Sequence, residues 1–119
     1  MSKIEKFEDL VVWQESLSLA MRVHKELIEC KNFGLKDQIQ RSAVSVPSNI
    51  AEGFERYSNK EFIRYLRIAK GSAGELRTQL HIAIGIGVLD KSVGEELLNK
   101  TRLISSMIHN LIKVRSEKF

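Results

Sequence analysis

Two stripes of different character run side by side along residues 38–57 when this stretch is wound as a helix. Apolar side chains recur at spacings of three, four or seven residues, namely Ile39, Ala43, Val46, Ile50 and Tyr57. Polar side chains recur beside them, namely Gln38, Ser42, Ser45, Asn49, Glu52 and Arg56. The polar stripe is mostly neutral amide and hydroxyl, unlike a solvated face rich in Lys and Glu. It therefore predicts a hydrogen-bonded seam against another helix or another subunit.

The same helical period covers most of the chain and predicts four helices. Their expected bounds are about 9–30, 35–56, 59–84 and 92–116. Helices of this size are roughly 30 to 40 Å long at 1.5 Å per residue, and short links make neighbours antiparallel. The predicted fold is all-α, a single domain over residues 1–119 arranged as an up-down-up-down four-helix bundle.

Polar residues mark the expected helix starts. Asp9 is placed to cap the first helix. Ser58 with Glu61, and Ser92 with Glu95, have the capping-box spacing and should open the third and fourth helices. Between the first two helices, Asn32 or Gly34 could take the left-handed conformation that ends a helix.

Pro47 interrupts the second helix. It has no amide hydrogen for the carbonyl of Ala43, and its ring crowds that turn, so a straight helix is excluded. Because both stripes keep their phase across Pro47, we expect a kink there and no break.

The first helix carries apolar residues on more than one side. One strip contains Leu10, Trp13, Leu17, Ala20, Met21, Leu27 and Ile28, and an adjoining strip contains Val12, Leu19 and Val23. A face this wide predicts contact with both the chain's own core and a neighbouring molecule.

The third helix contains small residues and a second polar line. Gly71 and Gly74 each cost about 1 kcal/mol relative to alanine in an isolated helix, so we expect close packing of a partner helix there. Ser72, Glu75 and Gln79 form a polar line beside the apolar stripe. We expect this line to meet the polar stripe of the second helix.

Composition is that of one ordinary soluble domain, with 119 residues, 43% hydrophobic and 29% charged. The single cysteine, Cys30, cannot form an internal disulfide. No signal peptide or membrane-spanning run is apparent, so we expect a cytoplasmic protein that does not enter a membrane.

Positive charge is concentrated in the second half of the chain. Residues 1–58 have a net charge of −1, whereas residues 59–119 have a net charge of +5. Four cations around the start of the third helix form one ridge, namely Arg56, Lys60, Arg64 and Arg67, and Lys70 adds charge at its side. We call these five residues the basic ridge. Such a ridge could bind RNA phosphates, or it could be a solvated face whose long side chains cover apolar surface.

No pattern of a common enzyme or metal site occurs. His24, His81 and His109 are far apart and lack partners at metal-ligand spacing. Glu52 and Glu75 could have perturbed pKa values if both faced the seam, but a structural hydrogen-bonding role is the favoured interpretation. We therefore expect no catalytic residues, no metal and no cofactor, with an activity inside the polar seam as the remaining alternative.

Several blocks of sequence resemble a known family. These are Phe7-Glu8-Asp9-Leu10 with Val12-Trp13, Gln38-Ile39 with Arg41-Ser42, Ser45-Val46-Pro47-Ser48-Asn49-Ile50-Ala51-Glu52-Gly53, Arg56, Phe62, and Gly71-Ser72 with Glu75-Leu76. They are similar to the four-helix-bundle proteins encoded in intervening sequences of bacterial 23S ribosomal RNA genes. They also resemble the related accessory variability determinant proteins of diversity-generating retroelements.

The resemblance implies an up-down bundle that assembles as a ring-like homopentamer, has no enzymatic activity and binds RNA. Structured RNA or a ribonucleoprotein, held through phosphate contacts, is thus the first expected partner. The alternative is a scaffold or accessory protein that docks a protein partner such as a reverse transcriptase.

Overall fold

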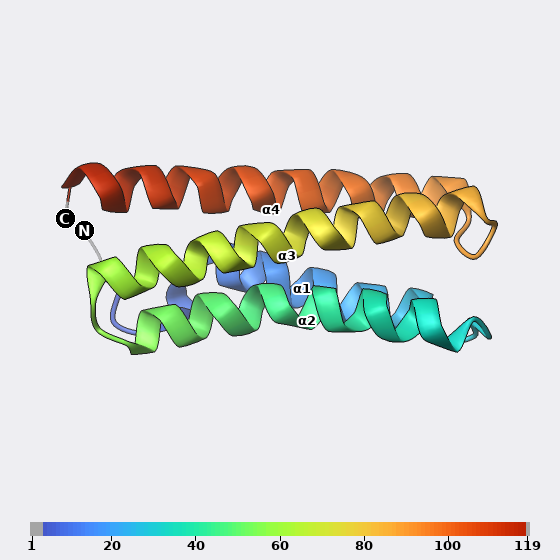
Figure 1. Ribbon diagram of the computed structural model, residues 1–119, viewed down its shortest axis with the longest axis horizontal. Helices are drawn as coiled ribbons and strands as arrows, with labels where there is room; N and C mark the ends of the chain where they lie inside the picture. Colours follow the sequence, from blue (N-terminus) through green and yellow to red (C-terminus); the bar gives the residue numbers. More distant parts are fainter. Residues whose placement is uncertain (1–3, 119) are drawn as a thin grey trace.

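The computed structural model describes residues 4–118, and this part of the chain is helical without strands. A short 3-10 helix, η1 (Phe7–Asp9), precedes α1 (Val11–Glu26), α2 (Phe33–Glu55), α3 (Asn59–Gly85) and α4 (Lys91–Lys118). The four long helices run along the 45 Å axis of a molecule 24 Å and 19 Å across (Figure 1). The predicted all-α four-helix bundle is confirmed.

The core follows the apolar stripe of each helix, but Tyr57, which we expected on the stripe of the second helix, lies beyond the end of α2 and is 82% exposed. Fully buried side chains include Ile50 of α2, Leu76 of α3 and Ile104 of α4. In α1 the narrower strip of Val12, Leu19 and Val23 is the buried one. Of the wider strip, Leu27 is also buried, whereas Trp13, Leu17 and Ala20 are half-buried and Met21 is exposed. Among residues 4–118, no helix has the length and continuous hydrophobicity needed to cross a bilayer.

The first two helix boundaries differ from the predictions. Asp9 does not cap α1, because it belongs to η1 and Leu10 takes the N-cap position without a side-chain hydrogen bond. α1 ends at Glu26, before the expected residue 30. Asn32 is not left-handed, with φ of −80°. Its side chain instead accepts a 3.2 Å hydrogen bond from the Leu35 amide, so α2 begins at Phe33.

The two predicted capping boxes have different outcomes. Ser58 caps α3, and its hydroxyl oxygen accepts the Glu61 amide at 3.3 Å. Ser92 does not cap α4, because the carboxylate of Asp90 accepts the Ser92 amide at 3.1 Å and the helix begins at Lys91. A carboxylate at this position also interacts favourably with the positive end of the helix dipole.

α2 runs through Pro47 without a break. On the next turn, the Asn49 side-chain amide donates to the carbonyl oxygen of Ser45 at 2.8 Å and to its hydroxyl oxygen at 2.9 Å. These bonds tie the turn around the proline together. The kink at Pro47 stays a prediction.

Close helix approach occurs at Gly53 and Gly94 and not at Gly71 and Gly74. A Cβ added to Gly53 would lie 2.5 Å from Cβ of Tyr65, and one added to Gly94 would lie 2.4 Å from Cγ1 of Ile84. A Cβ on Gly71 or Gly74 would meet nothing within 4 Å. The expectation that the α3 glycines admit a partner helix is therefore wrong within this chain, because they lie off the buried stripe.

Alanine substitutions at Gly53 and Gly71 are expected to change stability in opposite directions. Gly53→Ala should lower the free energy of unfolding by roughly 1 to 3 kcal/mol, because Cβ of Tyr65 cannot rotate away and the helices must separate. Gly71→Ala should raise it by up to about 1 kcal/mol through helix propensity alone. Urea denaturation followed by circular dichroism measures both. A stabilised Gly53→Ala protein would contradict the close approach.

Candidate functional site

The two predicted polar lines lie against each other between α2 and α3. The Ser42 hydroxyl donates to Oε1 of Glu75 at 2.8 Å. One turn further on, the hydroxyl groups of Ser45 and Ser72 are 2.8 Å apart. The seam therefore joins two helices of one chain through partly buried side-chain hydrogen bonds.

Three residues of the predicted seam lie apart from these bonds. Gln38 is exposed. Gln79 is buried in α3, and its Oε1 has no hydrogen-bond partner among the described residues. Glu52 is half-exposed and pairs with Arg56 at 2.8 Å, while it also accepts the Tyr65 hydroxyl at 3.1 Å.

The surroundings of Glu52 favour its ionised form. The hydrogen bond from Arg56, followed by that from Tyr65, lowers the pKa of the Glu52 carboxyl. The hydrogen bond to Glu52 in turn raises the pKa of Arg56. Glu52 is thus an acceptor that holds Arg56 and Tyr65 in place, and the lowered pKa disfavours a role as proton donor.

The basic ridge divides into two parts. Arg56 is paired with Glu52, and Arg64 lies 3.7 Å from Glu61; both guanidinium groups also lie 5.1 Å from the centre of the Tyr65 ring. The remaining ridge residues, Lys60, Arg67 and Lys70, are exposed. They form no ion pair within residues 4–118.

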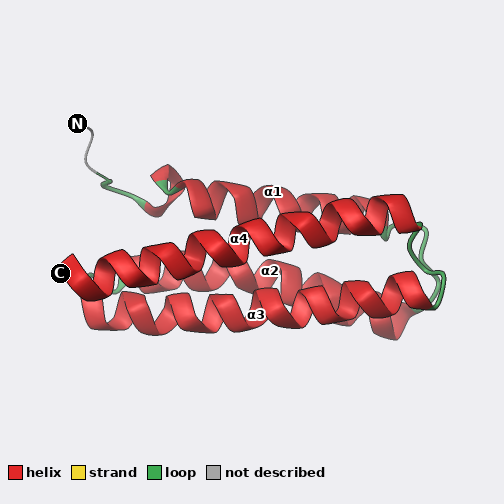
Figure 2. Cartoon of the chain, turned by 90° about the horizontal axis from the view of Figure 1, so that it is seen from above, coloured by secondary structure: helices red, strands yellow, loops and turns green. Residues whose placement is uncertain are grey.

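The structure adds α4 to this ridge. Lys70 Nζ lies 3.4 Å from Nδ1 of His109, and the two residues line a shallow polar hollow of about 310 Å³ with Ser105, Ser106 and Asn110. α3 and α4 run side by side along the whole bundle (Figure 2). Sequence reasoning missed this hollow because the two helices are 39 residues apart at the Lys70–His109 contact.

The shared surface of α3 and α4 lacks carboxylates. Neither residues 62–74 nor residues 97–116 contain an Asp or Glu. Within them, Arg67, Lys70 and Lys113 are exposed cations. The two acid-free runs can be read from the sequence, but only the tertiary structure places them next to each other. Cations so arranged can hold a chain of phosphates.

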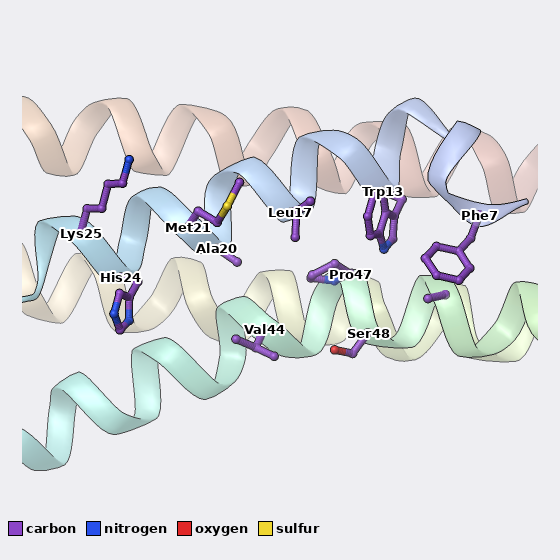
Figure 3. A pocket seen from close by; sticks show the side chains of 11 residues that line it. Phe7, Trp13, Leu17, Ala20, Met21, His24, Lys25, Val44, Pro47 and Ser48 are labelled. Carbon is purple, nitrogen blue, oxygen red and sulfur yellow. The ribbon is translucent and has the colours of Figure 1, made fainter.

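An apolar groove of about 600 Å³ lies between α1 and α2. Trp13, Leu17 and Met21 line it from α1, and Val44 and Pro47 line it from α2 (Figure 3). Phe7 of η1 lies at one end of the groove, where its ring meets the Trp13 ring edge-on with centroids 5.2 Å apart. The wider apolar strip of α1, which the core leaves partly exposed, thus forms one wall of this groove.

The remaining reactive side chains are dispersed. Within the described residues, no group of three or more His, Cys, Asp and Glu side chains could hold a metal ion. Cys30 is half-buried, and its thiol lies 3.7 Å from the carbonyl oxygen of Asn32. His24 Nδ1 lies 3.0 Å from the Gln40 side-chain nitrogen at the rim of the apolar groove.

Comparison with known proteins identifies relatives of this chain. A family model described as 23S rRNA-intervening sequence protein matches residues 8–110. A crystal structure of a protein of unknown function from the S23 ribosomal protein family of Bacteroides thetaiotaomicron is 31% identical. The match covers 87% of this chain and 99% of that one, with a TM-score of 0.81. The search among curated proteins gives no match. This chain belongs to the family of 23S rRNA-intervening sequence proteins.

Proposed function

We propose that this protein is a non-enzymatic, self-assembling helical bundle that binds RNA through backbone phosphates on the joined surface of α3 and α4. The distribution of charge carries this proposal. Arg67, Lys70 and Lys113 are exposed on two neighbouring helices whose adjoining runs contain no carboxylate. Their charge is not neutralised locally and is available to a polyanion.

Several other cations are already paired with carboxylates. Arg22 pairs with Glu96 and Glu26, Arg41 with Asp37, and Lys100 with Glu15. An arginine or lysine already paired with a carboxylate gains less from a phosphate, because the existing partner must be displaced. Hence we place the RNA on α3 and α4, with Arg67 and Lys70 of the predicted ridge at its centre.

Charge reversal on the proposed surface tests RNA binding. The double variant Arg67→Glu/Lys70→Glu should bind a structured RNA more weakly, and its plot of log Kd against log salt concentration should be shallower by about one per lost contact. Fluorescence anisotropy over a salt series measures this slope. Both side chains are exposed, so the fold should be unaffected.

The matched control is Lys31→Glu/Lys91→Glu, which changes net charge equally at the end of the bundle where α2 and α4 begin. It should retain nearly the wild-type slope. Equal slopes for the two double variants would remove Arg67 and Lys70 from the site. They would leave only a general attraction between a basic protein and RNA.

Self-assembly is supported by exposed apolar surface. Met21 and Val44 on the walls of the α1–α2 groove are 53% and 55% exposed. An exposed apolar ridge on α4, formed by Leu103, Met107 and Val114, recurs at spacings of four and seven residues; Leu103 is 47% and Val114 44% exposed. We propose that this ridge of one copy occupies the groove of the next.

A ridge and a groove on separate surfaces make a head-to-tail contact, which closes into a ring when the rotation between copies allows it. We propose a ring of five copies, with a particle mass five times the chain mass of 13.6 kDa. Sedimentation equilibrium measures that mass. A monomer at micromolar concentration would contradict the ring and would leave the groove open to a different protein. Capture of a reverse transcriptase would favour the accessory role if the captured complex survives nuclease treatment.

A further inference from the structure

Tyr57, in the link between α2 and α3, has an unusual backbone conformation. Its φ is 52°, and among the described residues it is the only non-glycine residue with positive φ. It follows the C-cap residue Arg56, at a position where glycine or asparagine is usual because a Cβ is unfavourable in the left-handed region. Its side chain is also 82% exposed. Burial in the core therefore does not explain a tyrosine at this position, and neither does the backbone conformation at the end of α2.

Tyr57 lines a hollow of about 460 Å³. This hollow is at the end of the bundle where the α2–α3 link and the last turn of α4 meet (Figure 1). Two further aromatic residues line it, Phe54 and Phe62, whose rings are edge-on with centroids 5.8 Å apart. The guanidinium carbon of Arg115 lies 4.9 Å from the centre of the Phe62 ring. The lining thus includes three aromatic residues, of which Tyr57 is the most exposed.

The charges around the hollow favour a neutral ligand. One carboxylate and one guanidinium line it, from Glu5 and Arg115. A phosphate would be repelled by Glu5, whereas a nucleobase is uncharged and presents both a stacking face and a polar edge. Lys60, three residues after Tyr57, is the first residue of the basic ridge that is exposed and forms no ion pair within residues 4–118. A strand whose phosphates lie along α3 could therefore place a base at Tyr57.

We propose that Tyr57 is a stacking platform for an unpaired nucleobase of the RNA bound on α3 and α4. This inference rests on the RNA-binding function proposed above and adds the class of RNA, one with single-stranded bases. Stacking on a tyrosine ring tolerates any base, because each base has a π face. The preference is therefore for unpaired over paired nucleotides and not for a sequence.

Replacing Tyr57 by glycine separates stacking from folding. Tyr57→Gly removes the ring and also supplies the residue type suited to positive φ, so its melting temperature should be at or above that of the wild type. Its Kd for a labelled oligouridylate of about 12 nucleotides should nevertheless rise about tenfold. Tyr57→Phe keeps the ring and should leave that Kd within about twofold.

Two controls make the test specific. Phe33 is 71% exposed at the start of α2, at the other end of the bundle, and Phe33→Ala should leave the oligouridylate Kd unchanged. An RNA duplex of the same length offers no open base face along its stem. Its Kd should be the same for wild type and Tyr57→Gly.

Three results would overturn the inference. They are an unchanged oligouridylate Kd in Tyr57→Gly, an equal loss of affinity for duplex and single strand, and a lowered melting temperature that accounts for the loss. Suppose that Tyr57→Gly leaves the oligouridylate Kd unchanged but Arg67→Glu/Lys70→Glu still weakens RNA binding. Only the stacking role of Tyr57 then fails, and the proposed RNA-binding function stands. Absence of binding by the wild-type protein to either RNA would instead reject the proposed function itself.

Discussion

A Val44→Arg protein is expected to be monomeric at concentrations where we propose that the wild type forms a ring. Val44 lies on the α2 wall of the apolar groove and is 55% exposed, so an arginine there does not disturb the core. In the proposed contact it would bring an unpaired charge into apolar surface, which is strongly unfavourable. Sedimentation velocity measures the loss of assembly, and circular dichroism checks that the helices remain.

The opposite surface gives a more discriminating experiment. Leu103→Arg should also abolish the ring, because Leu103 lies on the α4 ridge that we place in the neighbouring groove. A Val44→Arg chain keeps an intact ridge, and a Leu103→Arg chain keeps an intact groove. Mixing the two monomers should therefore yield a one-to-one dimer that cannot grow further.

The mixed experiment can contradict the proposed contact. If the groove of one copy packs on the groove of another, Leu103→Arg will still assemble by itself, Val44→Arg will not, and mixing the two will produce no one-to-one dimer. Ile28→Arg provides the matched control, since Ile28 is 62% exposed but lies outside both the groove and the ridge. It should assemble like the wild type.

The second large effect is expected in the core. Leu76→Ala should lower the free energy of unfolding by about 2 to 5 kcal/mol, because Leu76 is fully buried in α3 and its loss leaves a cavity. Urea denaturation of the Val44→Arg background at one protein concentration measures this value. The background matters because assembly makes apparent stability depend on concentration.

Two comparisons assign the effect of Leu76→Ala to burial. Leu103→Ala, the same substitution at a 47% exposed site, should cost less than about 0.5 kcal/mol in the monomeric background. Ser72→Ala removes a seam hydrogen bond to Ser45 and should cost about 1 kcal/mol. Equal losses at all three positions would mean that the apolar and polar stripes contribute alike, contrary to their difference in burial.

This expected difference separates the roles of the two stripes. The apolar stripe contributes most of the stability, because burial removes large apolar areas from water. The polar seam contributes less, but a serine pair or a serine–glutamate pair is satisfied only when α2 and α3 lie in one register. We therefore infer that the seam selects the alignment of the two helices.

Much of the fold could be predicted from the sequence because helix period is a local property. The repeat of Ile39, Val46 and Ile50 identifies a buried face whatever that face packs against. The residues at which helices begin were less predictable, because more than one nearby polar residue could accept the hydrogen bond at the N-cap. At the start of α4, Asp90 accepts the hydrogen bond in place of Ser92. At the start of α2, Asn32 accepts it, so that helix begins two residues before the expected start.

By itself the sequence determined four amphipathic helices, the two adjacent stripes on the second of them and the excess of positive charge after residue 58. The tertiary structure alone decided which distant surfaces meet. It joined Ser42 to Glu75, brought Lys70 beside His109, and placed Trp13 across a groove from Pro47. The physical reason is that periodicity defines the faces of each helix separately, whereas the contact between two faces depends on how all four helices pack around one core.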